Sequence, residues 1–268
     1  MSHPHSFVRL SSGNILATFQ HRRHDGAAAG GLVEFSPSGE MIRYSPPADA
    51  HHSGFVRPYS LAIISSLNRV VSTGHDMHQQ GTTRAVQVWR LSDLELLETI
   101  ELPNGPRGLE GTESGEARVL SDGKTVLVAT YRCGLFRLSA LETDSPRADL
   151  VYDFKGDDCV LPVLFDSFWV QTVPPHSVVT LDISRPPLPR EVARLELGPG
   201  ESPHWIAREP EGRRIALTGV GALLGRILIG SVAMDGRIAL DPSFVDASGK
   251  SGIRLDPGVP HGVVFSRP

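Results

Sequence analysis

Short apolar runs separated by tight polar turns dominate the chain. Three turns, at residues 11–14, 65–68 and 121–124, are rich in Ser, Gly, Asn and Asp. They separate apolar or alternating runs at 7–10 and 15–19, at 61–64 and 69–73, and at 117–120 and 125–130. Two such runs joined by a short turn of these residues are typical of a β-hairpin. Turns at 166–167 and 211–213 predict two more hairpins of the same kind.

Each of these hairpins is followed by a second one. The paired runs are 31–35 with 41–44, 85–89 with 95–102, 135–138 with 149–154, 178–183 with 191–197, and 227–232 with 238–245. The unit of four strands therefore recurs at a spacing of about 50 residues, which is the period expected of a repeat architecture. The pattern predicts five four-stranded units.

Four strands per repeat without helices are typical of the blades of a β-propeller. The 27 glycines and 21 prolines leave little room for long helices. We therefore expect an all-β fold, a propeller of about five to seven four-stranded blades, with residues 1–268 as a single propeller domain. A two-sheet sandwich is the alternative, but it does not explain the hairpin pairs. The tail, 258–265, is expected to be the first strand of a sixth unit or a strand that closes the ring.

Three of the predicted first strands begin with the same dipeptide. Pro-His occurs at 4–5, 203–204 and 260–261. Because the first strand of each blade lines the central channel, we expect His5, His204 and His261 to meet at one mouth of that channel. Neutral imidazole is the commonest ligand of transition metals, so the pattern suggests a metal site. The simpler interpretation is that proline starts each strand and histidine caps it.

The remaining histidines carry weaker signals. His176 follows a proline at the third strand of its blade, which places it farther from the channel axis. His75 and His78 form an H-x-x-H loop, which could ligate a metal but is more simply read as solvated. We expect exposed loop positions for His21, His24, His51 and His52.

Composition excludes several function classes. The chain has 26 Lys and Arg against 30 Asp and Glu, a net charge of −4, which does not favour nucleic acid or an anionic membrane surface. No apolar run is long enough to cross a bilayer, and the first residues do not form a secretory signal, so we expect a cytoplasmic protein if Met1 is its native start. The two cysteines exclude a disulfide framework and fit a reducing compartment.

Several of these segments resemble the selenium-binding protein family, which includes the copper-dependent methanethiol oxidases. The best segment is 180–190, Thr-Leu-Asp-Ile-Ser-Arg-Pro-Pro-Leu-Pro-Arg, followed by Leu-Glu-Leu-Gly at 195–198. Supporting segments are 30–33, 86–89, 211–215 and 236–244. His176 takes the place of a family histidine, and so do His5 and His261. Two features depart from the family: Leu67 stands where the family has a further histidine, and the cysteine-containing end of the family is absent. The chain is also shorter than a family member, which fits either a compact branch of the family or a chain that lacks the N-terminal blades.

The resemblance implies a propeller and a copper enzyme that oxidises a small thiol, with His5 and His261 as ligands and His176 as a further one. His204, which the repeated Pro-His dipeptide marks, is expected as a ligand of the same copper. The sequence assigns no catalytic residue. The alternative is a non-catalytic propeller that binds a small thiol, a selenium species or a protein partner. A lactonase-like hydrolase ranks last, because no carboxylate cluster occurs at the blade starts.

Overall fold

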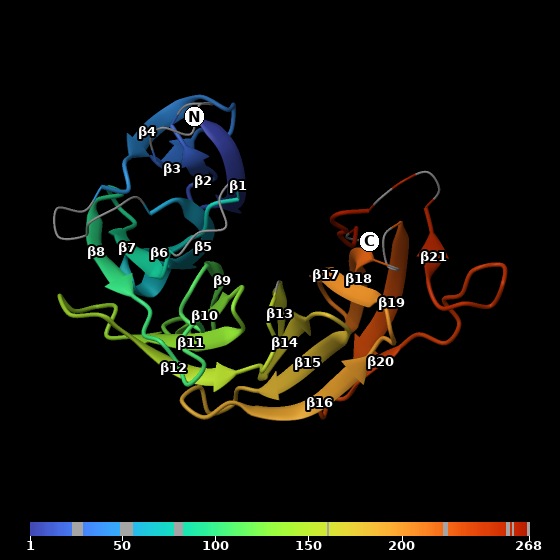
Figure 1. The fold of residues 1–268 in the computed structure, drawn as a ribbon. Coiled ribbons are helices and arrows are strands. Elements are labelled where there is room, and N and C mark those ends of the chain that lie inside the picture. The colour runs from blue at the N-terminus through green and yellow to red at the C-terminus, as the bar shows by residue number, and fades with distance from the viewer. Residues whose placement is uncertain are drawn as a thin grey trace. The chain divides into compact units, whose positions relative to one another are not determined.

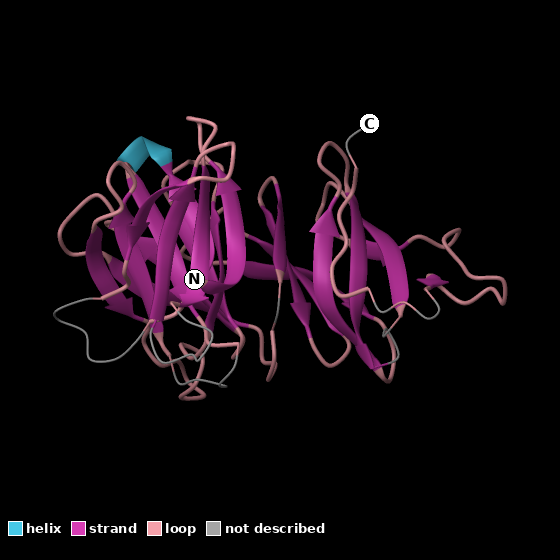
Figure 2. Cartoon of the chain, turned by 90° about the horizontal axis from the view of Figure 1, so that it is seen from above, coloured by secondary structure: helices cyan, strands magenta, loops and turns pink. Residues whose placement is uncertain are grey.

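The computed structural model describes residues 1–22, 29–48, 56–77, 83–159, 161–221, 225–255, 258 and 260–266. The chain divides into two units, Met1–Asp153 and Phe154–Pro268, which we describe separately. Among the described residues the regular structure consists of strands and one short 3-10 helix, η1 (Ser65–Leu67) (Figure 2). No helix in this part of the chain is long and apolar enough to span a membrane.

The first unit contains three four-stranded antiparallel sheets (Figure 1). The first sheet runs in the order β1 (Ser2–Arg9), β2 (Ile15–His21), β3 (Ala29–Phe35), β4 (Met41–Ser45). The second sheet consists of β5 (Pro58–Ile64), β6 (Arg69–Gly74), β7 (Ala85–Arg90) and β8 (Leu96–Glu101). The third consists of β9 (Ser114–Val119), β10 (Val126–Thr130), β11 (Gly134–Ser139) and β12 (Arg147–Asp153). Every strand pairs with its neighbour in sequence, so each sheet is a meander.

The second unit contains two more sheets of the same order. One is formed by β13 (Pro162–Phe165), β14 (Phe168–Val173), β15 (Ser177–Asp182) and β16 (Arg190–Glu196). The other is formed by β17 (Glu201–Arg208), β18 (Arg214–Gly221), β19 (Arg226–Val232) and β20 (Ile238–Leu240), and a two-residue strand, β21 (Ile253–Arg254), pairs with β19. The five sheets match the five predicted units, which confirms the all-β fold of four-stranded propeller blades.

Packing between sheets forms the core of the first unit. One cluster joins Leu16 and Leu32 of the first sheet to Leu61, Val70 and Trp89 of the second. A second cluster joins the apolar faces of the second and third sheets, and Phe136 of β11 lies fully buried within it. The apolar residues face these clusters because alternate side chains of a strand point to the same side. Each sheet is therefore stabilised by the one beside it.

Three first strands contain an irregularity at a proline. The pairing register shifts after Pro4 in β1, after Pro58 in β5 and after Pro203 in β17. Each of these strands is the edge strand of its sheet, where proline costs no ladder hydrogen bond, and a bulge redirects the side chain that follows. The residues after these prolines are His5, Tyr59 and His204. The sequence placed His5 and His204 at the starts of their strands, whereas the structure places each of them three residues inside its strand.

Near the C-terminus one predicted strand is shorter than expected, and another is absent from the described residues. The strand expected at 238–245 ends at Leu240, and Val245 instead forms an isolated bridge with Ser251. The described residues of the tail, 258 and 260–266, contain no strand. A residue is assigned to a strand only when a neighbouring backbone pairs with it, and hydrophobic pattern alone does not reveal whether that neighbour exists.

We expect Phe136→Ala to lower the free energy of unfolding of the chain by about 3–5 kcal/mol, because it removes a fully buried ring and leaves a cavity between two sheets. Urea denaturation followed by far-ultraviolet circular dichroism measures the change. Ile42→Ala, at a side chain that is 52% exposed on β4, is the control and should change it by less than about 0.5 kcal/mol. Equal effects of the two substitutions would contradict this assignment of the core.

Candidate functional site

Four aromatic side chains of the first unit form one contiguous group, His5, Tyr59, His75 and Tyr131, which we name the histidine–tyrosine cluster. His5 stacks on Tyr59 with ring centroids 3.5 Å apart, and His75 stacks on Tyr131 at 4.4 Å. The edge of Tyr59 meets His75 at 5.1 Å. The hydroxyls of Tyr59 and Tyr131 lie 2.7 Å apart, within hydrogen-bond distance. The four rings thus bring together three different sheets.

Equivalent positions of successive sheets supply these rings. His5 and Tyr59 follow the bulged prolines of β1 and β5. His75 directly follows β6, and Tyr131 directly follows β10, so both lie at the ends of second strands. First strands begin and second strands end at the same edge of an antiparallel meander. The architecture therefore places all four rings at one end of the unit.

The cluster is buried at its base and partly exposed at its rim. Tyr59 is 4% exposed, whereas His5, His75 and Tyr131 are partly exposed. Burial, followed by the nearby positive charge of His5, lowers the pKa of His75 to about 4. Burial and the adjacent Tyr131 raise the pKa of Tyr59 above its ordinary value. At neutral pH the cluster therefore presents a neutral imidazole and a neutral phenol.

Arg57, Asp76 and His21 form an ion-pair network, and Asp76 directly follows His75 of the cluster. The Arg57 Nε lies 2.7 Å from Oδ2 of Asp76, and its Nη1 lies 2.8 Å from Nδ1 of His21. Because a guanidinium only donates, Nδ1 of His21 accepts, and its proton lies on Nε2, which is 3.9 Å from Oδ1 of Asp76. His21 is 2% exposed, so its prediction as an exposed loop residue was wrong.

A buried glutamine holds the loop that carries His75. Gln20 of β2 is fully buried, and its Nε2 donates to the carbonyl oxygen of His75 at 2.7 Å. The backbone N–H of Met77 donates to Oε1 of Gln20 at 3.3 Å. His75 is therefore positioned by the neighbouring sheet, and its prediction as a solvated loop residue was also wrong. Its predicted partner, His78, lies outside the described residues, as do His24, His51 and His52.

The structure divides the four histidines predicted to be metal ligands between the two units. His5 belongs to the first unit, and its partner is Tyr59. In the second unit the rings of His204 and His261 lie 4.9 Å apart, and burial, then the charge of His261, lowers the pKa of His204. Nδ1 of His176 lies 3.3 Å from the carbonyl oxygen of Glu201. A site that joins all four stays a prediction.

The described side chains do not by themselves fit the copper centre that the resemblance implies. Neutral imidazoles are suitable donors for copper. However, no group of three or more His, Cys, Asp or Glu side chains in this part of the chain is arranged to hold a metal ion. We therefore derive no chemistry through copper.

Both cysteines are buried, and neither is a free thiol. They supply no thiolate to a site. They also give no argument for a reducing compartment, so the cytoplasmic location stays a prediction.

Sequence reasoning missed Tyr59 and Tyr131 and did not group His75 with His5, although the repeat contained the signal. Tyr59 follows Pro58 just as His5 follows Pro4, one repeat earlier. His75 and Tyr131 lie after second strands at the same repeat spacing of about 55 residues. A search for Pro-His alone overlooked tyrosine at an equivalent position. Comparison of all aromatic residues across the repeats would have found the cluster.

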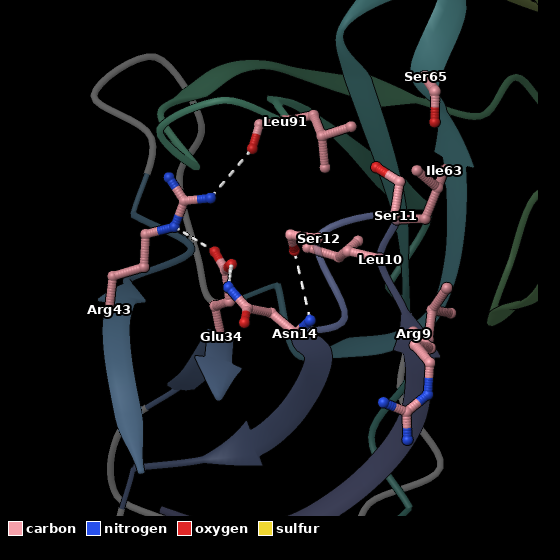
Figure 3. Close-up of a pocket in the computed structure, with 11 residues that line it drawn as sticks. Arg9, Leu10, Ser11, Ser12, Asn14, Glu34, Arg43, Ile63, Ser65 and Leu91 are labelled. Atoms are coloured by element: carbon pink, nitrogen blue, oxygen red, sulfur yellow. Dashed lines mark hydrogen bonds and ion pairs between the residues drawn. The ribbon is translucent and has the colours of Figure 1, made fainter. Parts of the chain in front are cut away.

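A pocket of about 370 Å³ lies at the opposite ends of β1 and β5 (Figure 3). The Glu34 carboxylate in its wall accepts hydrogen bonds from Arg43 Nε at 2.5 Å and Asn14 Nδ2 at 2.6 Å. Arg43 also donates to the carbonyl oxygen of Leu91 at 3.2 Å. These polar groups join the first sheet to the second, and we assign them a structural role.

Comparisons with known proteins show the fold and no family. No protein-family model matches the chain, and no curated protein matches it. The chain is similar to a solved hypothetical selenium-binding protein from Sulfolobus tokodaii, with 15% identity and a TM-score of 0.72, over 100% of this chain and 71% of that one. It is also similar to a protein from Lactobacillus plantarum, with 11% identity and a TM-score of 0.67, over 89% and 70% of the two chains.

A third similar structure is a functionally unknown protein from Desulfotomaculum acetoxidans, with 11% identity and a TM-score of 0.60, over 88% of this chain and 68% of that one. Identities this low establish a common fold alone. The first neighbour agrees with the resemblance that the sequence segments show at the level of the fold alone.

The lowered pKa of His75 predicts how stability depends on pH. Between about pH 6.5 and pH 4 the unfolded chain binds a proton that the folded chain excludes, so this group makes the fold less stable as the pH falls through that window. We expect His75→Phe to make the decline shallower, by less than about 1.4 kcal/mol per pH unit because the ring is partly exposed. Urea midpoints measured from pH 4 to 7 test this.

Tyr44→Phe is the control for this titration. Like His75→Phe, this substitution leaves a phenyl ring in the first unit. It removes the Tyr44 hydroxyl, which donates to the carbonyl oxygen of Gly30 at 2.8 Å. This variant should lose some stability at every pH and keep the wild-type slope. A slope unchanged by His75→Phe would show that His75 is not protected from protonation.

Proposed function

We propose that this chain is a ligand-binding β-propeller protein that binds a small thiol or selenium compound at the histidine–tyrosine cluster. One observation carries the proposal: a partly exposed, neutral imidazole, His75, is held between two tyrosines and beside a second imidazole. Solvent reaches the rim of this group, whereas its base is buried.

The chemistry of the cluster suits a soft ligand atom. Sulfur interacts favourably with aromatic rings, and selenium is polarizable in the same way. A neutral imidazole offers both an N–H donor and an acceptor nitrogen, and a phenol offers an O–H donor. A thiol or a selenium compound could therefore both contact the rings and exchange a hydrogen bond. His75 and Tyr59 are both uncharged at neutral pH, so these two rings do not favour a hard anion.

The similar structure from Sulfolobus tokodaii supports the same class of ligand, because it is described as a hypothetical selenium-binding protein. The sequence segments that resemble this family support it independently. Neither argument identifies the compound, so the proposal extends to the class of ligand only.

Copper-dependent oxidation of a small thiol is the second candidate function. The observation that favours it is the close pair of imidazoles, His204 and His261, which are two of the four histidines predicted from the sequence to be ligands. Copper analysis of protein expressed in copper-replete medium separates the candidates. Stoichiometric copper together with thiol-dependent oxygen consumption would favour the oxidase, and metal-free protein that binds the thiol would favour the binding protein.

For the binding function, we expect His75→Phe to weaken methanethiol binding at least tenfold, about 1.4 kcal/mol, because the variant keeps the ring and removes both nitrogens. Isothermal titration calorimetry on the full chain measures the affinity. Methanol has the same shape with a hard oxygen in place of sulfur, and we expect it to bind much more weakly. A parallel anaerobic titration with methaneselenol, whose donor atom is a soft selenium, tests the selenium arm.

Tyr44→Phe again serves as the matched control and should bind methanethiol like the wild type. Equal binding by wild type and His75→Phe would contradict the assignment of the site. Equal binding of methanol and methanethiol would contradict the preference for a soft atom.

A further inference from the structure

The same threonine contact occurs three times, twice between one sheet and the first strand of the next and once between β18 and the C-terminal tail. The hydroxyl of Thr18 in β2 donates to the carbonyl oxygen of Tyr59 at 2.7 Å, and that of Thr73 in β6 donates to the carbonyl oxygen of Gly115 in β9 at 2.5 Å. The hydroxyl of Thr218 in β18 donates to the carbonyl oxygen of His261 at 3.0 Å. His261 therefore occupies the position of a residue in a following first strand, although the tail forms no regular strand.

The ring pairs are equivalent as well. His5 and His204 follow the bulged prolines of the first strands β1 and β17. Tyr59 and His261 each follow a proline and accept the threonine hydrogen bond from the preceding sheet. The pair His204–His261, with centroids 4.9 Å apart, thus repeats the pair His5–Tyr59, with centroids 3.5 Å apart.

A tryptophan holds the tail at a second point. Nε1 of Trp205 donates to the carbonyl oxygen of Val263 at 3.0 Å, and the ring lies 6.2 Å from that of His261. A Cβ added at Gly262 would lie 3.5 Å from the indole, so the tail packs directly over this ring. His204 and Trp205 are partly buried, and His261 is exposed.

We propose that the second unit contains a second, weaker site for a soft sulfur or selenium ligand, formed by His204 and His261 with Trp205 as its aromatic wall. The ligand class rests on the proposed function of the first unit. The site itself rests on the repeated threonine contact and on the ring pair. Weaker binding follows because His261 is exposed, whereas its counterpart in the first unit, Tyr59, is 4% exposed.

The test is a titration of the full chain with methanethiol, followed by NMR of the imidazole C–H signals, which report on each histidine separately. We expect the His75 signal to shift first and the His204 and His261 signals to shift at a concentration at least tenfold higher. Thr218→Val removes the hydroxyl that holds His261 and should abolish the second response while leaving the first unchanged. Thr218→Ser keeps the hydroxyl and should restore it.

The outcomes separate this proposal from the function on which it rests. Shifts at His75 alone, or a second response that persists in both Thr218→Val and His261→Phe, would overturn the second site and leave the first intact. Shifts at His204 and His261 alone would support the second site and contradict the proposed function of the first unit. Absence of shifts at all three histidines would overturn both. Methaneselenol replaces methanethiol in a parallel anaerobic titration and distinguishes the selenium ligand from the sulfur ligand.

Discussion

The hydroxyl of Thr18 connects two sheets and a bulge at the same time. It accepts a hydrogen bond from the backbone N–H of Ser6 in β1 at 2.9 Å, and it donates one to the carbonyl oxygen of Tyr59 in β5. The irregular start of β1 leaves backbone groups that its own ladder does not satisfy, and buried backbone groups require partners. Thr73 makes the same two contacts one sheet later, with Ser60 and Gly115. These threonines fix how one first strand lies against the next.

The placement of the aromatic rings depends on this constraint. A bulge turns His5 and Tyr59 toward one another, and the threonine contacts set the distance between their strands. His75 and Tyr131 then complete the group from the ends of second strands. Burial of an imidazole in such a group keeps it neutral, because a charged ring would lose its hydration. The cluster is thus a consequence of how meander sheets pack in the first unit.

The two ends of the first unit differ in how their polar groups are used. At the pocket end, Glu34 is paired with Arg43 and Asn14, and these bonds join adjacent sheets. At the cluster end, Arg57 and Asp76 pair with each other and support the rings from the side, while His75 reaches the surface with a lowered pKa. At the pocket end these polar groups are engaged in holding neighbouring sheets together. Neutral and partly exposed rings suit a ligand at the cluster end.

The sequence alone determined the strands, their meander order and the five units, because alternation within strands and Gly, Asn and Asp turns between them are local signals. It also marked His5, His204 and His261, because the Pro-His dipeptide repeats. Only the tertiary structure decided that Tyr59 stacks on His5 and that His75 stacks on Tyr131. Those contacts join strands about 55 residues apart, and they depend on which side chain a bulge redirects and on which sheet packs against it. Hydrophobic pattern does not contain that information.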